Sequence, residues 1–195
     1  MSFLHTHFYE GTKSELDFFT LPPTQTSIES ASWVEYKPIT SLSDDAPIEF
    51  VVPGQSDEYL DLARTMLFLK VRIVGGKGEN IASKDLISPV NNFLHSLFNQ
   101  VDVFLNQKAV SPPNNGYSYR SYIETLLNYD KSAKKSHLTC ALWSQNSAGS
   151  MDAGLTFAAN VSASANTGAL KRAAFFSNSQ VVDLLGHLHC DIFNQ

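Results

Sequence analysis

Two histidines near the end of the chain have the spacing best suited to chemistry. His187 and His189 lie two residues apart, so in a strand their imidazoles would share one face and could chelate a metal ion. A dioxygenase site of this kind also needs a glutamate a few residues later, where this chain has Phe193, Asn194 and Gln195. We therefore favour a surface or interface role for the pair, and we predict no metal ligand and no cofactor.

Other motifs of enzyme chemistry are incomplete. The pair His5-x-His7 repeats the histidine spacing within an expected N-terminal arm. The segment "VGGKGEN" lacks the G-x-x-x-x-G-K-[ST] spacing of a phosphate loop and indicates a hairpin turn instead. No G-x-S-x-G nucleophile elbow is present, and Asp57, Glu58 and Asp61 have no identifiable partner for acid–base catalysis. We predict no catalytic residues, and hence a protein that is not an enzyme.

Two segments have the periodicity of short helices. In residues 89–98, apolar side chains recur at i, i+3, i+4, i+7 and i+8, and we expect this helix to bury Phe93, Leu94, Leu97 and Phe98. A strand should follow, because Val101, Val103 and Leu105 alternate with other side chains. In the second helix, "YRSYIETLLNY", one apolar face comprises Tyr119, Tyr122, Ile123, Leu126 and Leu127.

Most of the remaining chain is predicted to be extended. Candidate strands are residues 32–40, residues 47–54 and the segment "TMLFLKVRIV", in which Leu67, Leu69, Val71 and Ile73 share a face. The opposite face is half apolar and half charged, so we expect one end of it to be covered. "SHLTCALW" is ambiguous, although it alternates like a strand. Residues 169–193 suggest two strands around "SNSQ", after a long surface loop at 144–168.

Composition narrows the class of protein. The chain has 195 residues, 43% of them apolar, enough for one domain with a packed core. Its net charge of −5 argues against a dedicated nucleic-acid binder. A local basic face, formed by Lys131, Lys134 and Lys135 or by Lys171 and Arg172, stays open, although a solvated surface is the favoured interpretation.

Targeting signals and cysteines point to an intracellular setting. Cys140 and Cys190 cannot form a disulfide framework, so a reducing compartment is expected. The N-terminus lacks the charged and apolar regions of a signal peptide, and no stretch approaches about 20 apolar residues, so we expect neither secretion nor a membrane span.

Short strands separated by turns, with no βαβ alternation, favour an all-β antiparallel jelly-roll sandwich with short helices in its connecting loops. The expected organisation is an N-terminal arm at residues 1–24, followed by a jelly roll at residues 25–195. We expect this jelly roll to be truncated at its C-terminus.

Six phrases in order resemble a known family. They are "KSELDFFTLPPTQTSIES", "PIEFVVPG", "YLDL", "PVNNFLHSLFNQVDVFLNQKAVS", "YRSYIETLLNY" and "GHLHCDIFNQ". Together they resemble the N-terminal part of the major capsid protein, or hexon, of Polinton (Maverick) elements and the related adintoviruses. The resemblance covers almost the whole chain, from about Lys13 to Gln195.

This resemblance implies a structural role. Its members are similar to double jelly-roll capsid proteins, in which three chains form a trimeric pseudo-hexameric capsomer. Capsomers then tile an icosahedral shell around double-stranded DNA. Expected partners are other copies, neighbouring capsomers, a minor capsid or penton protein and, indirectly, the packaged DNA. The expected location is the virion capsid, assembled inside the host cell in the cytoplasm or nucleus.

The high aromatic content of the chain fits such a structural role. The 13 phenylalanines and 7 tyrosines exceed what the predicted core needs, and aromatic side chains favour interfaces.

Two alternatives to the capsid role stay open. The first alternative is a jelly-roll metal-dependent enzyme or ligand-binding module. A sugar site would want exposed aromatic side chains, but Trp33 and Trp143 lie in contexts suited to a core. The second is a domesticated host protein that kept the fold and lost assembly.

Overall fold

The computed structural model describes residues 28–42, 46–54, 58–82, 87–111, 115–151 and 166–193. The chain forms two units, Met1–Glu58 and Tyr59–Gln195. The predicted arm at residues 1–24, and with it His5 and His7, lies outside the described residues, as does the predicted boundary that follows it.

The first unit contains extended chain that does not form a ladder. One backbone hydrogen bond joins Ile39 N–H to the Glu49 carbonyl at 2.8 Å, and the Thr40 hydroxyl accepts from Glu49 N–H at 3.1 Å. The strands predicted at 32–40 and 47–54 are therefore wrong, because both segments are described throughout and neither contains a strand residue. Trp33 is 69% exposed and does not belong to a core.

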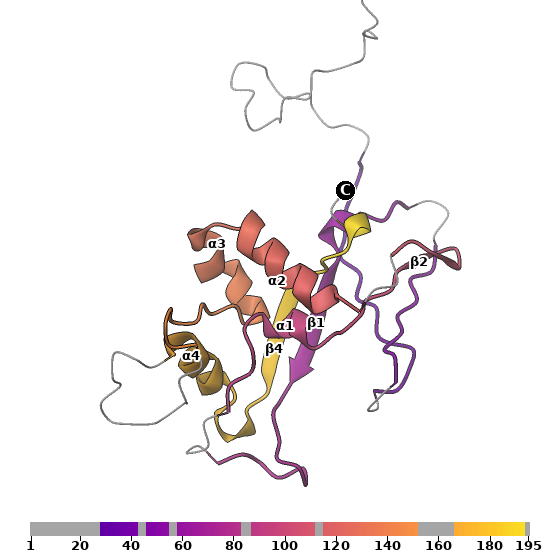
Figure 1. Cartoon of the computed structure of the whole chain (residues 1–195). Coiled ribbons are helices and arrows are strands. Elements are labelled where there is room, and N and C mark those ends of the chain that lie inside the picture. Colours follow the sequence, from indigo (N-terminus) through magenta and orange to yellow (C-terminus); the bar gives the residue numbers. More distant parts are fainter. Residues whose placement is uncertain are drawn as a thin grey trace, which may run out of the picture. The chain divides into compact units, whose positions relative to one another are not determined.

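The second unit is built on a small antiparallel sheet (Figure 1). Strand β1 (Met66–Val71) pairs with β4 (Val182–His187), with Leu69 opposite Leu184 and Lys70 opposite Asp183. Strand β1 was predicted, and its alternation makes every second side chain half-buried. The strand predicted after "SNSQ" is confirmed only as far as His187, because the residues that follow leave the ladder and Asp191–Phe193 form a 3-10 turn. A two-residue turn at Asn106 and Gln107, both with positive φ, joins β2 (Phe104–Leu105) to β3 (Lys108–Ala109).

Most of the helices and 3-10 turns lie between β1 and β4 in the chain, while η2 precedes β1 and η5 follows β4. The α-helices are α1 (Phe93–Ser96), α2 (Tyr117–Asn128), α3 (Lys131–Lys135) and α4 (Thr167–Phe175). The 3-10 turns are η2 (Leu62–Arg64), η3 (His137–Ala141), η4 (Ser177–Ser179) and η5 (Asp191–Phe193). None of the helices in the described part of the chain is long and apolar enough to cross a membrane.

The jelly-roll expectation is wrong. The described residues contain two sheets of two strands each, together with several helices, which is a mixed architecture and not an all-β sandwich. The segment "SHLTCALW" forms η3, which ends at Leu142 in the left-handed conformation (φ 58°). The segment that precedes β4 also differs from the predicted sandwich.

That segment was predicted to be a strand and forms α4. Its residues Ala169, Leu170, Lys171 and Arg172 are strong helix formers. The side chain of Asn166 caps the helix by accepting a hydrogen bond from Ala169 N–H at 3.2 Å. A capped stretch of good helix formers therefore forms a helix in place of the predicted strand. The predicted loop at 144–168 therefore ends where α4 begins, and most of it lies outside the described residues.

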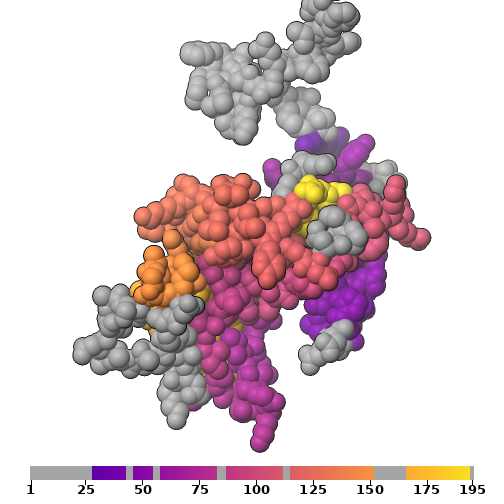
Figure 2. Space-filling view, in the orientation of Figure 1, coloured from indigo at the N-terminus to yellow at the C-terminus, as the bar shows by residue number. Residues whose placement is uncertain are grey.

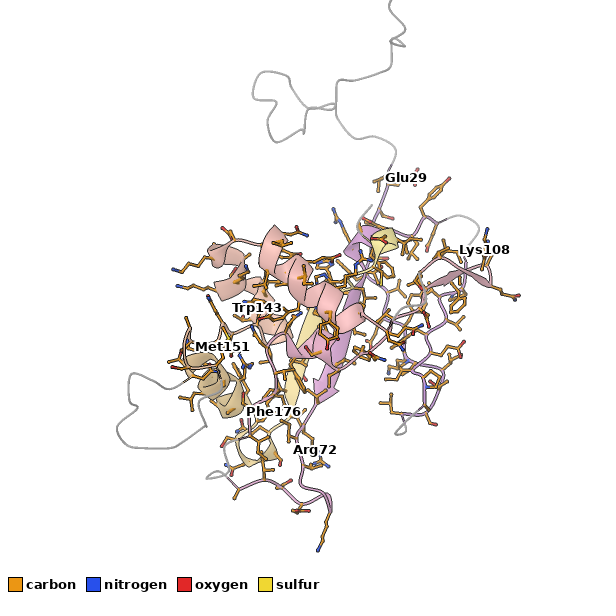
Figure 3. The ribbon with its side chains drawn as sticks, viewed as in Figure 1. Glu29, Arg72, Lys108, Trp143, Met151 and Phe176 are labelled. Atoms are coloured by element: carbon orange, nitrogen blue, oxygen red, sulfur yellow. The ribbon has the colours of Figure 1, made fainter. Side chains whose placement is uncertain are left out.

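The core lies on one face of the β1–β4 sheet. Leu94, Ala141, Leu142, Phe176 and Leu184 form its buried centre, with Leu67, Leu69 and Val71 packed against it. Phe93 meets Phe176 edge-on, with ring centroids 5.7 Å apart. In Figure 3 the side chain of Phe176 lies near the junction of α4 and β4, within this unit.

Helix α1 approaches β4 closely at Gly186, where an added Cβ atom would require the Leu94 side chain to shift. A Cβ atom there would lie 2.7 Å from Leu94 Cδ2 and 3.3 Å from His95 Nε2. The close approach seals one end of the inner face and brings His95 beside the sheet. Of the four side chains predicted to be buried by the helix, Leu94 is buried, Phe93 and Phe98 are half-buried and Leu97 is exposed.

A buried arginine joins α4 to two other segments. Arg172 Nε donates to the Pro89 carbonyl at 2.8 Å, and Nη2 donates to Asn146 Oδ1 at 2.8 Å. The same guanidinium also bonds to the Ser144 carbonyl. Burial lowers the pKa of Arg172 from its ordinary value. Arg172 thus positions α4 and takes no part in an exposed basic face with Lys171.

Candidate functional site

Helix α2 contains the most chemically varied part of the described chain. It follows Gly116 and ends before Tyr129, whose backbone is extended. Its location was predicted correctly from the apolar period. The side of the helix that faces the interior, however, was not the apolar one: Tyr117, Ser121 and Thr125 are its buried residues.

Hydrogen bonds between hydroxyls and amides hold this interior side. Asn92, in the left-handed conformation before α1, donates through Nδ2 to Ser121 Oγ at 3.3 Å. Thr125 Oγ1 donates to the Ser121 carbonyl at 2.7 Å. Each of these buried polar groups has a partner, so burial carries no uncompensated desolvation cost. The Asn92–Ser121 bond joins α2 to the residue that precedes α1, whereas the Thr125 bond lies within α2.

Near its first turn, α2 joins a cluster of ionisable side chains. His95 Nδ1 lies 3.0 Å from Tyr117 Oη, and His189 Nδ1 lies 2.8 Å from Glu124 Oε2. The rings of His95 and His189 meet edge-on, with centroids 4.6 Å apart. We call His95, Tyr117, Glu124 and His189 the polar cluster. It ties α1, α2 and the segment after β4 together.

Arg120 extends the polar cluster toward solvent. Its Nε donates to Glu124 Oε1 at 2.7 Å, and its Nη2 donates to Asp191 Oδ1. Beside it lies a small pocket of about 30 Å³, lined by residues that include Tyr117, His189 and Cys190. Ordinary ligand sites occupy roughly 300–1,000 Å³, so this pocket has room for water and not for a substrate.

Burial governs the protonation states in the polar cluster. It lowers the pKa of His95 to about 3, with a smaller contribution from the charge of His189, so His95 is neutral at physiological pH. Burial also raises the pKa of Tyr117. At Glu124, burial raises the pKa, but hydrogen bonds from Arg120 and His189 outweigh it and the net shift is downward.

Two groups at the edge of the polar cluster, Asp191 and Cys190, also have shifted pKa values. The hydrogen bond from Arg120 lowers the pKa of Asp191. Burial raises the pKa of the Cys190 thiol, which favours its protonated form. Cys190 is buried and Cys140 is exposed, and both are free thiols. The polar cluster and Arg120 together form a hydrogen-bonded network of ionisable side chains.

The two histidines singled out in the sequence, His187 and His189, lie in different surroundings. His187 ends β4 with an exposed side chain, whereas His189 is bound to Glu124 inside the polar cluster. Within the described ranges, no three His, Cys, Asp or Glu side chains are grouped so that they could hold a metal ion. Of the acidic trio, Asp61 pairs with Arg64 at 3.3 Å on the surface, and Asp57 lies outside those ranges.

The outer side of α2 is apolar and open to solvent. Tyr119, Ile123, Leu126 and Leu127 are exposed there, Leu127 at 78% of its full area. We call these four residues the α2 stripe. Tyr122 lies at its edge, with its ring 5.2 Å from that of the buried Trp143. Figure 2 shows the α2 and α3 region as part of the visible surface.

Sequence periodicity located the α2 stripe but missed the polar cluster. The apolar side chains gave the helix its period, and the polar residues on the opposite side repeat at the same spacing. Tyr117, Ser121 and Thr125 are four residues apart, and that repeat is the signal that could have identified a buried polar face. His95 and His189 are too distant in sequence for any such pattern.

Comparisons with known proteins give one relative and no family. The chain is 31% identical over 128 residues to "Uncharacterized protein F54H12.2" of Caenorhabditis elegans, an alignment that covers 62% of this chain and 30% of that protein. The chain therefore spans about 30% of the length of this curated relative. No family model matches the chain. No solved structure matches it either.

Proposed function

We propose that the chain is a structural protein that assembles with copies of itself, as a capsid protein of the Polinton and adintovirus type. The observation that carries the proposal is the α2 stripe: a helix with polar residues buried and apolar residues exposed. Monomeric soluble proteins rarely expose contiguous apolar patches of this kind, which more often mark interaction sites. The six sequence phrases described above add the capsid class to this physical argument.

The geometry of the described residues suits a structural role better than a catalytic one. The groups with shifted pKa values are bonded to one another and not aimed into a space of substrate size. A shell protein requires rigid bodies with self-complementary surfaces, and symmetry multiplies modest contacts. The polar cluster supplies rigidity behind the α2 stripe. Trimeric capsomers, a penton partner and a location in the virion belong to this proposal.

Sedimentation velocity over a concentration series, with negative-stain electron microscopy of the same samples, tests the proposal. The chain is expected to form trimers or larger regular particles as concentration rises. Ile123→Glu should reduce this association at least tenfold, because it places a charge in the contact. The matched control is Lys131→Glu, a charge change on the neighbouring helix α3. A chain that remains monomeric at every concentration would refute the proposal.

A further inference from the structure

The second exposed apolar surface is the outer face of the β1–β4 sheet, which has opposite charges at one end. Within the ladder this face consists of three cross-strand pairs, Met66 with His187, Phe68 with Leu185 and Lys70 with Asp183, and Arg72 is exposed directly after β1. All six side chains are exposed, whereas the inner side chains of both strands pack on the core. The expectation that one end of this face is covered is therefore wrong.

The face has an apolar middle and opposite charges at one end. Phe68 is 51% exposed and Leu185 39%. Lys70 Nζ lies 3.9 Å from Asp183 Oδ1, with both side chains more than half exposed, so this pair stabilises the fold little. Each strand contributes one charge of the pair, and this placement determines which symmetry can bring two faces together.

We propose that two copies dock these faces about a twofold axis parallel to the strands. That axis exchanges the two strands, so β1 of one copy lies over β4 of the other. Lys70 then faces Asp183 of the second copy, Phe68 faces Leu185, and Met66 faces His187. Face-to-face sheets pack about 10 Å apart with strands within about 30° of each other, which this axis allows.

The other possible twofold axis, perpendicular to the strands, matches the charges less well. It would place Lys70 over Met66 of the second copy, so the ammonium would have no counter-charge on that copy. The parallel axis instead forms a square of four alternating charges from two Lys70–Asp183 pairs. Charge complementarity therefore selects one arrangement, and electrostatic matching of this kind sets register more than affinity.

The contact is small, which determines how it can act. Two strands of six residues cover about 200 Å², whereas each partner in a stable dimer buries about 800 Å². The face therefore serves as one of several weak contacts in an assembly. In this respect the inference rests on the proposed function, since only repeated contacts would hold the copies together.

A charge exchange between two variants tests the docking. Lys70→Glu makes the pair all acidic, and Asp183→Lys makes it all basic, so each variant alone should associate about tenfold more weakly than the wild type. A 1:1 mixture should recover association to within about threefold. Each chain in the mixture keeps its internal like charges, so recovery can come only from contact between copies.

Controls separate this result from misfolding and from the proposed function. Both variants should unfold within about 3 °C of the wild type, because the pair is exposed. Lys108→Glu makes the same charge change on the β2–β3 hairpin, where Figure 3 shows Lys108, and should leave association unchanged. If the wild type associates but the mixture does no better than either variant alone, the docking is refuted and self-assembly stands. A wild type that never associates refutes both.

Discussion

The two sides of α2 differ in what holds them. The inner side places Tyr117, Ser121 and Thr125 in the interior, where each has a directional hydrogen-bond partner. The outer side places Ile123 and Leu127 in solvent, with no such partner to fix their position. An ordinary surface helix has the opposite arrangement. The comparison teaches that α2 is positioned by polar contacts, which leaves its apolar side free for contact with other molecules.

The largest expected effect on stability is that of a leucine substitution in the core, compared with the same substitution on the surface. Leu94 is fully buried and Leu127 is 78% exposed. Leu94→Ala should lower the free energy of unfolding by about 3 kcal/mol, because it leaves a cavity in the core. Leu127→Ala should change it by less than about 0.5 kcal/mol. Urea denaturation of dilute protein measures both, and equal losses would contradict the comparison.

The second effect is acid destabilisation through the polar cluster. The pKa of His95 is about 3 in the folded chain, whereas its ordinary value of 6.5 applies in the unfolded chain. The unfolded chain therefore binds the proton first, and stability that is complete above pH 6.5 is lost progressively as the pH falls toward 3. At pH 5 the loss from this residue is about 2 kcal/mol.

Denaturation midpoints between pH 7 and pH 4 measure that loss. His95→Asn should be less stable at pH 7 but should lose less between pH 7 and pH 5. His137→Gln, a matched change of an exposed histidine, should keep the wild-type pH dependence. An unchanged acid limb in His95→Asn would show that neutral His95 is not the source.

The third effect concerns the carboxylate that joins the two ends of the polar cluster. Glu124 accepts hydrogen bonds from Arg120 and His189, and these hold its pKa below the ordinary value. Its stabilising contribution is present above its ordinary pKa and is lost as the pH falls through the lowered value. Glu124→Gln should cost about 1 kcal/mol at pH 7, since the site is partly exposed. Glu35→Gln, an exposed glutamate, is the control for urea denaturation, and an equal cost there would count against the network.

Sequence patterns predicted where several helices and strands lie better than they predicted which side chains of those elements are buried. The β1 and β4 strands and helix α2 follow from alternation and from helical period, which are local properties. Whether the apolar face of α2 is covered depends on the rest of the molecule, and periodicity carries no information about that. Trp143 is buried as expected, yet Trp33 is not, for the same reason.

The sheet and the polar cluster depended on contacts between distant residues. The jelly-roll prediction assumed that every extended segment joins a ladder, but residues 39 and 49 share a single backbone bond. The polar cluster joins His95, Glu124 and His189 across almost a hundred residues of sequence. Helix α4 was a local error, because the Asn166 cap and the helix formers that follow were both readable in the sequence.

Substitutions on the α2 stripe should change stability little and self-association most. Leu126→Gln and Leu127→Gln lie on the α2 stripe, and together they should change the free energy of unfolding by less than about 1 kcal/mol. The same double change should weaken self-association at least tenfold, because it removes apolar area from the contact. Circular dichroism melts and concentration-dependent light scattering separate the two quantities.

The central claim is that the α2 stripe is a contact between copies of this chain. Sedimentation equilibrium of the wild type and the Leu126→Gln, Leu127→Gln double variant, at matched concentrations and under reducing conditions because Cys140 is exposed, tests it most directly. The account predicts a wild type that associates as concentration rises and a folded variant that stays monomeric. Identical association of the two proteins would contradict it.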